Sequence, residues 1–138
     1  MTTQDIRWKQ RFDNFDRAVD LLREPILKGV DSLSDLEQEG TIQRFEVALE
    51  LAWKTLKDYL EYGGAVIDPI TPRAVIKEAF AAGIIPDGQI WIDMLDDRNR
   101  LSHTYDQGTF RETVRAVHNR YLPAFEELRA WLKEHIGE

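Results

Sequence analysis

The chain has 138 residues, 43% of them hydrophobic, with 25 acidic and 18 basic side chains and a net charge of -7 at pH 7. Such a chain can bury a sizeable core, which excludes a disordered protein, and its acidic balance excludes a nonspecific nucleic-acid coat. The sequence has no cysteine, which excludes disulfides, thiolate catalysis and thiolate zinc sites and suits a reducing compartment.

Two long amphipathic helices are predicted in the first half of the chain. Apolar residues recur at helical spacing from Trp8 to Ile26, and Pro25 should kink or end that stripe. Ser34 with Glu37 three residues later has the form of a capping box, which predicts the start of a second helix.

Helix signals continue through the middle of the chain. The second helix should run to Gly63–Gly64, although Gly40 could delay its start. Thr71 is a good N-cap because Pro72 follows it, and Gly83 is a good stop. A short third helix is therefore expected between them.

Two further helices complete the predicted fold. Pro86–Gly88 should open the fourth helix, which is expected to end near Asp106–Gly108. The last helix should start at Thr109, with Glu112 completing a second capping box, and Pro123 should bend it.

Alternating strand-type residues are confined to 65–67, a stretch too short for a sheet. We therefore predict an all-α fold, an antiparallel up-and-down four-helix bundle with an extra short helix, as one domain over residues 1–138. No apolar run approaches the roughly 20 residues of a membrane span, and Met1–Gln10 lacks a signal-peptide apolar block. We expect a cytoplasmic protein with no membrane partner.

Large aromatic and acidic side chains have plain structural interpretations. Asp93, Asp96 and Asp97 share a predicted solvated face with Arg100, and Asp96 with Arg100 forms an ordinary i,i+4 pair, so no metal site is expected there. Four tryptophans fall on the apolar stripes of four helices and should anchor the core: Trp8, Trp53, Trp91 and Trp131.

The segment 97–105 is the most informative, because it puts a guanidinium where the apolar pattern requires a core residue. On a helix that advances about 100° per residue, Arg98 lies in the middle of the apolar arc around Trp91, and Asn99 and His103 share the edge of that arc. Burying a guanidinium is costly unless it is paired or meets an anion. Arg98 should therefore face a carboxylate, a cage of carbonyls or a ligand.

Two interpretations of this arginine stay open. In one, Glu46 or Glu50 of the second helix neutralises Arg98, and His103 caps a helix end. In the other, Arg98 and His103, which diverge by about 140° on a helix, flank a groove. A second copy related by a two-fold axis would then bring two such pairs to one cleft. Ser102 is no nucleophile in either case, since neighbouring helical residues point about 100° apart.

The string R-N-x-x-x-H-x-Y, formed by Arg98, Asn99, His103 and Tyr105, resembles the motif of the HEPN superfamily. Members of that superfamily are small helical-bundle proteins and often metal-independent RNases. Residues 42–46 and 51–60 look like the branch called nucleotidyltransferase substrate-binding proteins, which is related to HepT toxins. The likeness spans the chain from about residue 8 to residue 122.

The resemblance implies a homodimer with its motif residues at the subunit cleft, and a minimal nucleotidyltransferase encoded nearby as partner. In HepT/MntA-type pairs that partner is the antitoxin and transfers AMP to the tyrosine of the H-x-Y element, here Tyr105. An older interpretation of the branch is that the helical protein binds substrate for the nucleotidyltransferase. No cofactor is expected under either interpretation.

The side chains suit metal-independent cleavage of RNA, with tRNA as a candidate substrate. His103 could act as base or acid near neutrality, Arg98 matches phosphate oxygens, and Asn99 could orient the imidazole or bond the ribose. We predict these three as catalytic residues, with Arg100 and Ser102 contacting substrate. The predicted products are a 2′,3′-cyclic phosphate and a free 5′-hydroxyl.

Charge limits where RNA could bind. AMP on Tyr105 would add negative charge beside the cleft and oppose an incoming phosphate.

The alternative function is a noncatalytic adaptor of the nucleotidyltransferase, in which Arg98 only holds a nucleotide phosphate. For the nuclease, a local basic rim would have to offset the acidic total, and its candidate members are Arg73, Lys77, Arg98, Arg100, Arg111, Arg115 and Arg120.

Overall fold

Helices form nearly all of the chain in a computed structural model that describes residues 3–136. They are α1 (Thr3–Lys28), the 3₁₀ turn η1 (Val30–Ser32), α2 (Asp35–Tyr62), α3 (Pro72–Ala81), α4 (Gly88–Leu101), α5 (Gln107–Ala116), the π-helical segment η2 (Val117–Tyr121) and α6 (Leu122–His135). No strand occurs within residues 3–136, so the all-α prediction is confirmed. Over the same range no helix combines the length and apolar character needed to cross a bilayer.

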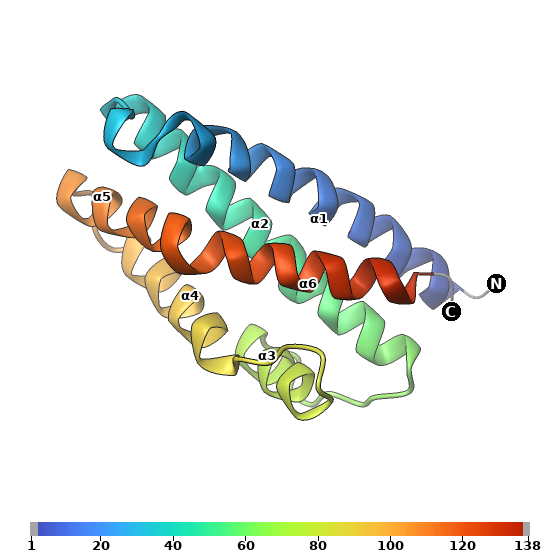
Figure 1. The fold of residues 1–138 in the computed structure, drawn as a ribbon. Helices are drawn as coiled ribbons and strands as arrows, with labels where there is room; N and C mark the ends of the chain where they lie inside the picture. The colour runs from blue at the N-terminus through green and yellow to red at the C-terminus, as the bar shows by residue number, and fades with distance from the viewer. Residues whose placement is uncertain (1–2, 137–138) are drawn as a thin grey trace.

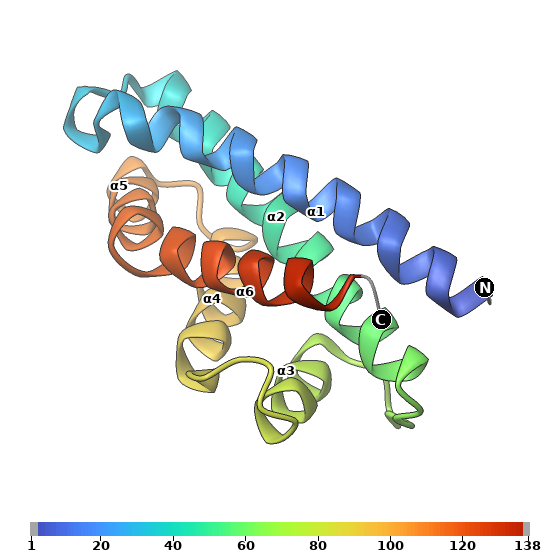
Figure 2. The same cartoon turned by 45° about the vertical axis from the view of Figure 1, so that its right-hand side comes forward.

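The two longest helices, α1 and α2, lie side by side and antiparallel along the whole molecule (Figure 1). The C-terminal helix packs across this pair, with α5 against α2 and α6 against α1. The helix α4 contacts α5 and η2, and the short α3 lies between α2 and α4 (Figure 2). The helix α2 therefore contacts α5 directly, and Glu50 of α2 reaches α4 through an ion pair with Arg98.

The C-terminal helix changes direction at η2, as comparison of Figures 1 and 2 shows. Pro123 has no amide hydrogen to donate to the carbonyl of Asn119, so regular α-helical bonding cannot pass this point. The chain instead makes a π-helical segment directly before the proline, a common way to absorb such a defect. The bend expected at Pro123 is thus present at η2, directly before the proline.

Most predicted helix starts are confirmed. The Ser34 side chain accepts from the Glu37 amide at 3.1 Å, and the Glu37 carboxylate accepts from the Ser34 amide at 2.9 Å, which completes the capping box. Thr71 and Asp87 cap α3 and α4 through their side chains. Gly40 does not delay α2, because the cap fixes its first turn at Asp35.

Two predicted boundaries around the motif were wrong. The helix α4 ends at Leu101, because the amides of Ser102 and His103 turn back to carbonyls of its last turn. The next helix starts at Gln107 and not at Thr109, since the Asp106 carboxylate is its N-cap and accepts from the Thr109 amide at 3.2 Å. The segment between the two caps is therefore a loop.

The first helix also runs further than its proline suggested. Pro25 was expected to kink or end this helix, and the second alternative was wrong, because Pro25 lies inside α1, which continues to Lys28. Lys28 then pairs with Glu37 in the first turn of α2. That ion pair and the Ser34 amide lower the pKa of Glu37 to about 2. The turn between α1 and α2 is thus held by charge as well as by the cap.

Phe125 of α6 lies at the centre of the core and is fully buried. Its ring packs against Trp91 of α4, with 5.5 Å between the ring centroids. The centroids of Phe15 on α1 and Phe45 on α2 each lie 6.2 Å from that of Phe125. One aromatic cluster thus joins the four helices that make the core.

The prediction that all four tryptophans anchor the core was only half right. Trp8 and Trp91 are buried, whereas Trp53 and Trp131 are partly exposed. Trp131 stacks on His135 with 3.6 Å between ring centroids, and Trp53 donates a hydrogen bond to a carboxylate. These two rings cover the edge of the core and not its centre.

Replacing Phe125 by alanine should lower the free energy of unfolding by about 3–5 kcal/mol, because it leaves a cavity where four helices meet. Leu27→Ala is the matched control, since that side chain is 74% exposed. The control should change stability by less than about 0.5 kcal/mol. Urea unfolding followed by tryptophan fluorescence measures both, and equal effects would contradict this core.

Candidate functional site

Arg98 lies in the last turn of α4, where that helix faces α2. Its Nη1 donates to Oε2 of Glu50 at 3.4 Å, and 28% of the arginine side chain remains exposed. The guanidinium is therefore at the edge of the core, shallower than the apolar pattern predicted, because its partner also lies at the surface with 41% of its side chain exposed. Arg98 is paired with an acid and still open to a ligand.

Glu50 is a well-anchored carboxylate. Trp53 Nε1 donates to its Oε2 at 2.9 Å, and Lys54 Nζ lies 2.9 Å from its Oε1. Burial acts to raise the pKa of Glu50, but the hydrogen bonds from Lys54 and Trp53 and the charges of Lys54 and Arg98 outweigh it and lower the pKa. Glu50 thus stays ionised at neutral pH and fixes the guanidinium.

Glu46 lies one turn earlier on α2 and behaves in the opposite way. Burial raises its pKa, and the positive charge of Arg98 opposes that shift only in part. Two carboxyl groups near one guanidinium therefore have pKa values displaced in opposite directions, an arrangement typical of acid–base sites. Sequence analysis considered both only as neutralising partners, although their i,i+4 spacing on one helix face was the available signal.

The predicted site residues after Leu101 lie in the loop between α4 and α5. His103 is exposed, and within the described chain its imidazole has no hydrogen-bond partner. Asn99 is also exposed, and its backbone carbonyl accepts from the Ser102 hydroxyl at 2.7 Å. Because the helix stops at Leu101, the prediction that Asn99 and His103 share one helical edge was wrong. Within residues 3–136 no hydrogen bond joins His103 to Arg98.

Tyr105 extends from the same loop with 84% of its surface exposed. Its hydroxyl donates to the Glu39 carboxylate, and its ring meets Phe110 edge-on at 5.3 Å. The hydrogen bond to Glu39 raises the pKa of Tyr105. Sequence analysis missed Glu39, since the contact joins residues 66 positions apart and no local pattern marks it.

A groove lies beside Glu46 and Tyr105, and its lining does not include Arg98, Asn99 or His103. It has a volume of about 210 Å³ and lies between α2 and the start of α5. Its lining includes Glu39, Glu46, Leu101, Tyr105 and Phe110. The acid next to Arg98 and the exposed tyrosine therefore open onto one surface.

The predicted basic rim is largely neutralised. Three aspartates of α4 each hold an arginine: Asp93 with Arg120 at 2.6 Å, Asp96 with Arg73 at 2.9 Å and Asp97 with Arg100 at 3.1 Å. The expected Asp96–Arg100 pair was thus wrong, because Asp96 turns to α3. In the part of the chain that the structure describes, no three His, Asp or Glu residues are grouped so that they could hold a metal ion.

Comparison with known proteins gives a family and two relatives. The model of the family described as "Nucleotidyltransferase substrate binding protein like" matches residues 10–134. A curated protein named "Probable ribonuclease HepT", from Haemophilus influenzae, is 38% identical over 71 residues, which are 49% of each chain. The match thus spans about half the length of that relative. A crystal structure of a protein from Thermus thermophilus is 29% identical with a TM-score of 0.71, and covers 90% of this chain and 99% of that chain.

Glu46→Gln should stabilise the protein at pH 7 and have no effect near about pH 4. A carboxyl group with a raised pKa favours folding below its ordinary pKa of 4.5, and this contribution is lost as the pH rises through the folded value. Glutamine removes the cost of burying the charge. Urea unfolding at both pH values provides the measurement.

Glu50→Gln is the matched control, because the pKa of Glu50 is lowered. It should destabilise the protein at pH 7, and the loss should fade as the pH falls through the folded pKa. Effects of the same sign from the two substitutions would show that the assigned environments are wrong.

Proposed function

This chain belongs to the nucleotidyltransferase substrate binding protein-like family, the HepT-like branch of the HEPN superfamily, and from that premise we propose that it is a metal-independent endoribonuclease. The name of the Haemophilus relative supports the reaction class. The observation that carries the proposal is Arg98, which is anchored by an ionised Glu50 and still exposed to a ligand. An arginine held in this way can receive a phosphate without having to leave its partner.

In the proposed reaction, the 2′-hydroxyl of an RNA ribose attacks the phosphodiester on the same nucleotide. A base removes the 2′-hydroxyl proton, the 2′-oxygen bonds to phosphorus, and the bond to the 5′-oxygen breaks as an acid protonates it. His103 and Glu46 supply groups that can give or take a proton, and Arg98 stabilises the charge that develops on phosphorus oxygens. Asn99 orients the imidazole or the ribose, and Arg100 and Ser102 contact the substrate.

A homodimer is part of this proposal. Within one chain Arg98 and His103 lie on different elements, the helix α4 and the loop after it. A two-fold copy would bring a second His103 toward the same groove and complete the acid–base pair. The proposal also treats residues 1–138 as one cytoplasmic domain. In it, α1, α2, α4 and the α5–α6 helix form an up-and-down four-helix bundle, with α3 as the extra short helix.

The second candidate function is a noncatalytic adaptor that presents a nucleotide to a separately encoded minimal nucleotidyltransferase. The neutralised rim favours it, since Arg73, Arg100 and Arg120 are each paired with an aspartate of α4. Such a surface attracts a long RNA weakly. Arg98 would then bind a single nucleotide phosphate.

Regulation by the partner nucleotidyltransferase follows from the position of Tyr105. In the proposed step its oxygen attacks the α-phosphorus of ATP, the bond to pyrophosphate breaks, and the phenol proton passes to Glu39. A phenol is protonated at neutral pH, so a base must take its proton, and Glu39 already accepts the hydrogen bond of this hydroxyl. The product carries a negative AMP group on the groove and would repel an RNA phosphate, so the pair would act as toxin and antitoxin.

Purified protein, free of its partner, should cleave total tRNA in the presence of EDTA and leave 2′,3′-cyclic phosphate ends. His103→Ala and Arg98→Ala should each slow cleavage by a factor of about 100 to 10,000, since one removes proton transfer and the other removes charge stabilisation. Gel electrophoresis with end-group analysis measures both.

His118→Ala is the control for that experiment, because this exposed imidazole lies on η2, outside the candidate site, and forms a hydrogen bond with the neighbouring Asn119. The His118→Ala protein should cleave tRNA at the parent rate. Cleavage that persists in both site variants, or that requires a metal ion, would falsify the mechanism. No cleavage, combined with tight binding to a nucleotidyltransferase, would favour the adaptor.

Co-expression with a minimal nucleotidyltransferase should increase the intact mass by one adenylyl group and abolish tRNA cleavage. Tyr105→Phe should prevent the adduct, and Glu39→Gln should slow its formation because the proton acceptor is lost. Tyr62→Phe, a change on α2 outside the groove, should be modified normally. An adduct that survives Tyr105→Phe would assign the modification elsewhere.

A further inference from the structure

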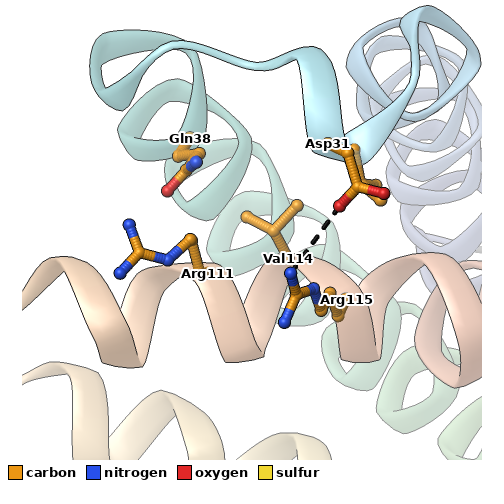
Figure 3. A pocket seen from close by; sticks show the side chains of 6 residues that line it. Asp31, Gln38, Arg111, Val114 and Arg115 are labelled. Atoms are coloured by element: carbon orange, nitrogen blue, oxygen red, sulfur yellow. Dashed lines mark ion pairs between the residues drawn. The ribbon is translucent and has the colours of Figure 1, made fainter.

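A second, smaller pocket lies on the other flank of α5, between η1, the start of α2 and α5 (Figure 3). Its volume is about 110 Å³, which is enough for a phosphate-sized group together with water. The residues that line it are Val30, Asp31, Gln38, Arg111, Val114 and Arg115. Nothing in the proposed reaction uses this pocket.

The two arginines of the pocket are the available cations of α5. They lie four residues apart on one face of the helix, so both reach the same space. Arg111 is exposed and has no ion pair in the described part of the chain. Arg115 lies 3.7 Å from Asp31, with 61% and 86% of the two side chains exposed, so solvent screens this pair and an anion can replace the aspartate. The pocket therefore holds one arginine without an ion pair and one in a long, exposed pair with Asp31, which also lines the pocket.

Gln38 favours a ligand that can donate a hydrogen bond. Its side chain is almost completely buried, its Nε2 donates to the Leu33 carbonyl at 3.4 Å, and its Oε1 has no hydrogen-bond partner in the described structure. Figure 3 shows the amide directed into the pocket toward Arg111. A buried acceptor without a donor is unfavourable, and a phosphate oxygen cannot satisfy it. A ligand that carries a hydroxyl or amine beside its negative charge would satisfy this acceptor.

We infer that this pocket is an RNA-binding exosite that holds a phosphodiester on Arg111 and Arg115 and the neighbouring ribose 2′-hydroxyl on Gln38. RNA places a hydroxyl donor next to each 3′-phosphate, and DNA lacks it. On α5 the pocket begins at Arg111, next to Phe110, which lines the groove of Tyr105. On α2, Gln38 adjoins Glu39, the partner of that tyrosine. An RNA strand bound at this pocket would therefore extend to the groove. The inference rests on the proposed function, because it takes RNA as the substrate.

Binding of a fluorescent single-stranded oligoribonucleotide, and of DNA of the same sequence, tests the exosite by anisotropy in EDTA. All proteins carry His103→Ala, so that cleavage does not interfere. Arg111→Gln should weaken binding of RNA and DNA alike, by roughly five- to ten-fold at about 50 mM salt, and should lower the slope of log K against log salt by about 0.7. Arg7→Gln near the start of α1, which removes an exposed charge without an ion pair in the described chain and outside the predicted basic rim, is the matched control and should change neither value.

Gln38→Leu tests the hydroxyl contact separately. It should weaken RNA binding and leave DNA binding unchanged, so that the preference for RNA is lost. The variant removes the unpaired acceptor and also the hydrogen bond to the Leu33 carbonyl, so urea unfolding checks that the fold is retained. Equal weakening of RNA and DNA by this variant would overturn the hydroxyl contact.

The outcomes separate the exosite from the nuclease. Cleavage of tRNA by the unmodified protein, combined with unchanged affinity and salt slope in Arg111→Gln, would overturn the exosite and leave the nuclease standing. A protein that neither binds nor cleaves RNA would overturn both.

Discussion

The ion pair between Arg98 of α4 and Glu50 of α2 is the contact on which the candidate site depends. A guanidinium cannot enter the core without an anion, and an unpaired one at the surface would have no fixed direction. Glu50 resolves both problems because Trp53 and Lys54 hold its two oxygens, so its charge and position are set before any ligand arrives. The cation is then oriented by the fold and kept partly exposed.

The loop after α4 determines how the other motif residues are presented. Amides of Ser102 and His103 close the last turn of α4, and the Asp106 carboxylate opens α5, so only a short segment separates the two helices. A short loop between fixed caps exposes His103 and Tyr105 without burying their polar groups. Tyr105 gains direction from Glu39 of α2 and from the ring of Phe110. The same helix α2 thus supports both ends of the groove.

The position of exposed positive charge on this protein depends more on ion pairing than on the net charge. The net charge of -7 comes from acids that also neutralise most of the arginines near the motif. Arg111 has no ion pair in the described chain, Arg98 keeps 28% of its side chain exposed beside Glu50, and the aspartate that pairs with Arg115 is itself 86% exposed. Any polyanion must therefore bind at a few points, and the strength of that binding will depend on salt.

The sequence alone determined the helices, the capping box at Ser34, the stops at Gly63 and Gly83, and the motif that identifies the family, because each of these depends on residues close together in the chain. It placed Arg98 too deep and extended α4 too far, since apolar spacing cannot tell whether Asp106 caps a new helix or continues an old one. Tertiary structure alone decided the partners of the site residues. Glu50 and Glu39 meet Arg98 and Tyr105 from 48 and 66 residues away, and only the packing of α2 against α4 and α5 brings those side chains together.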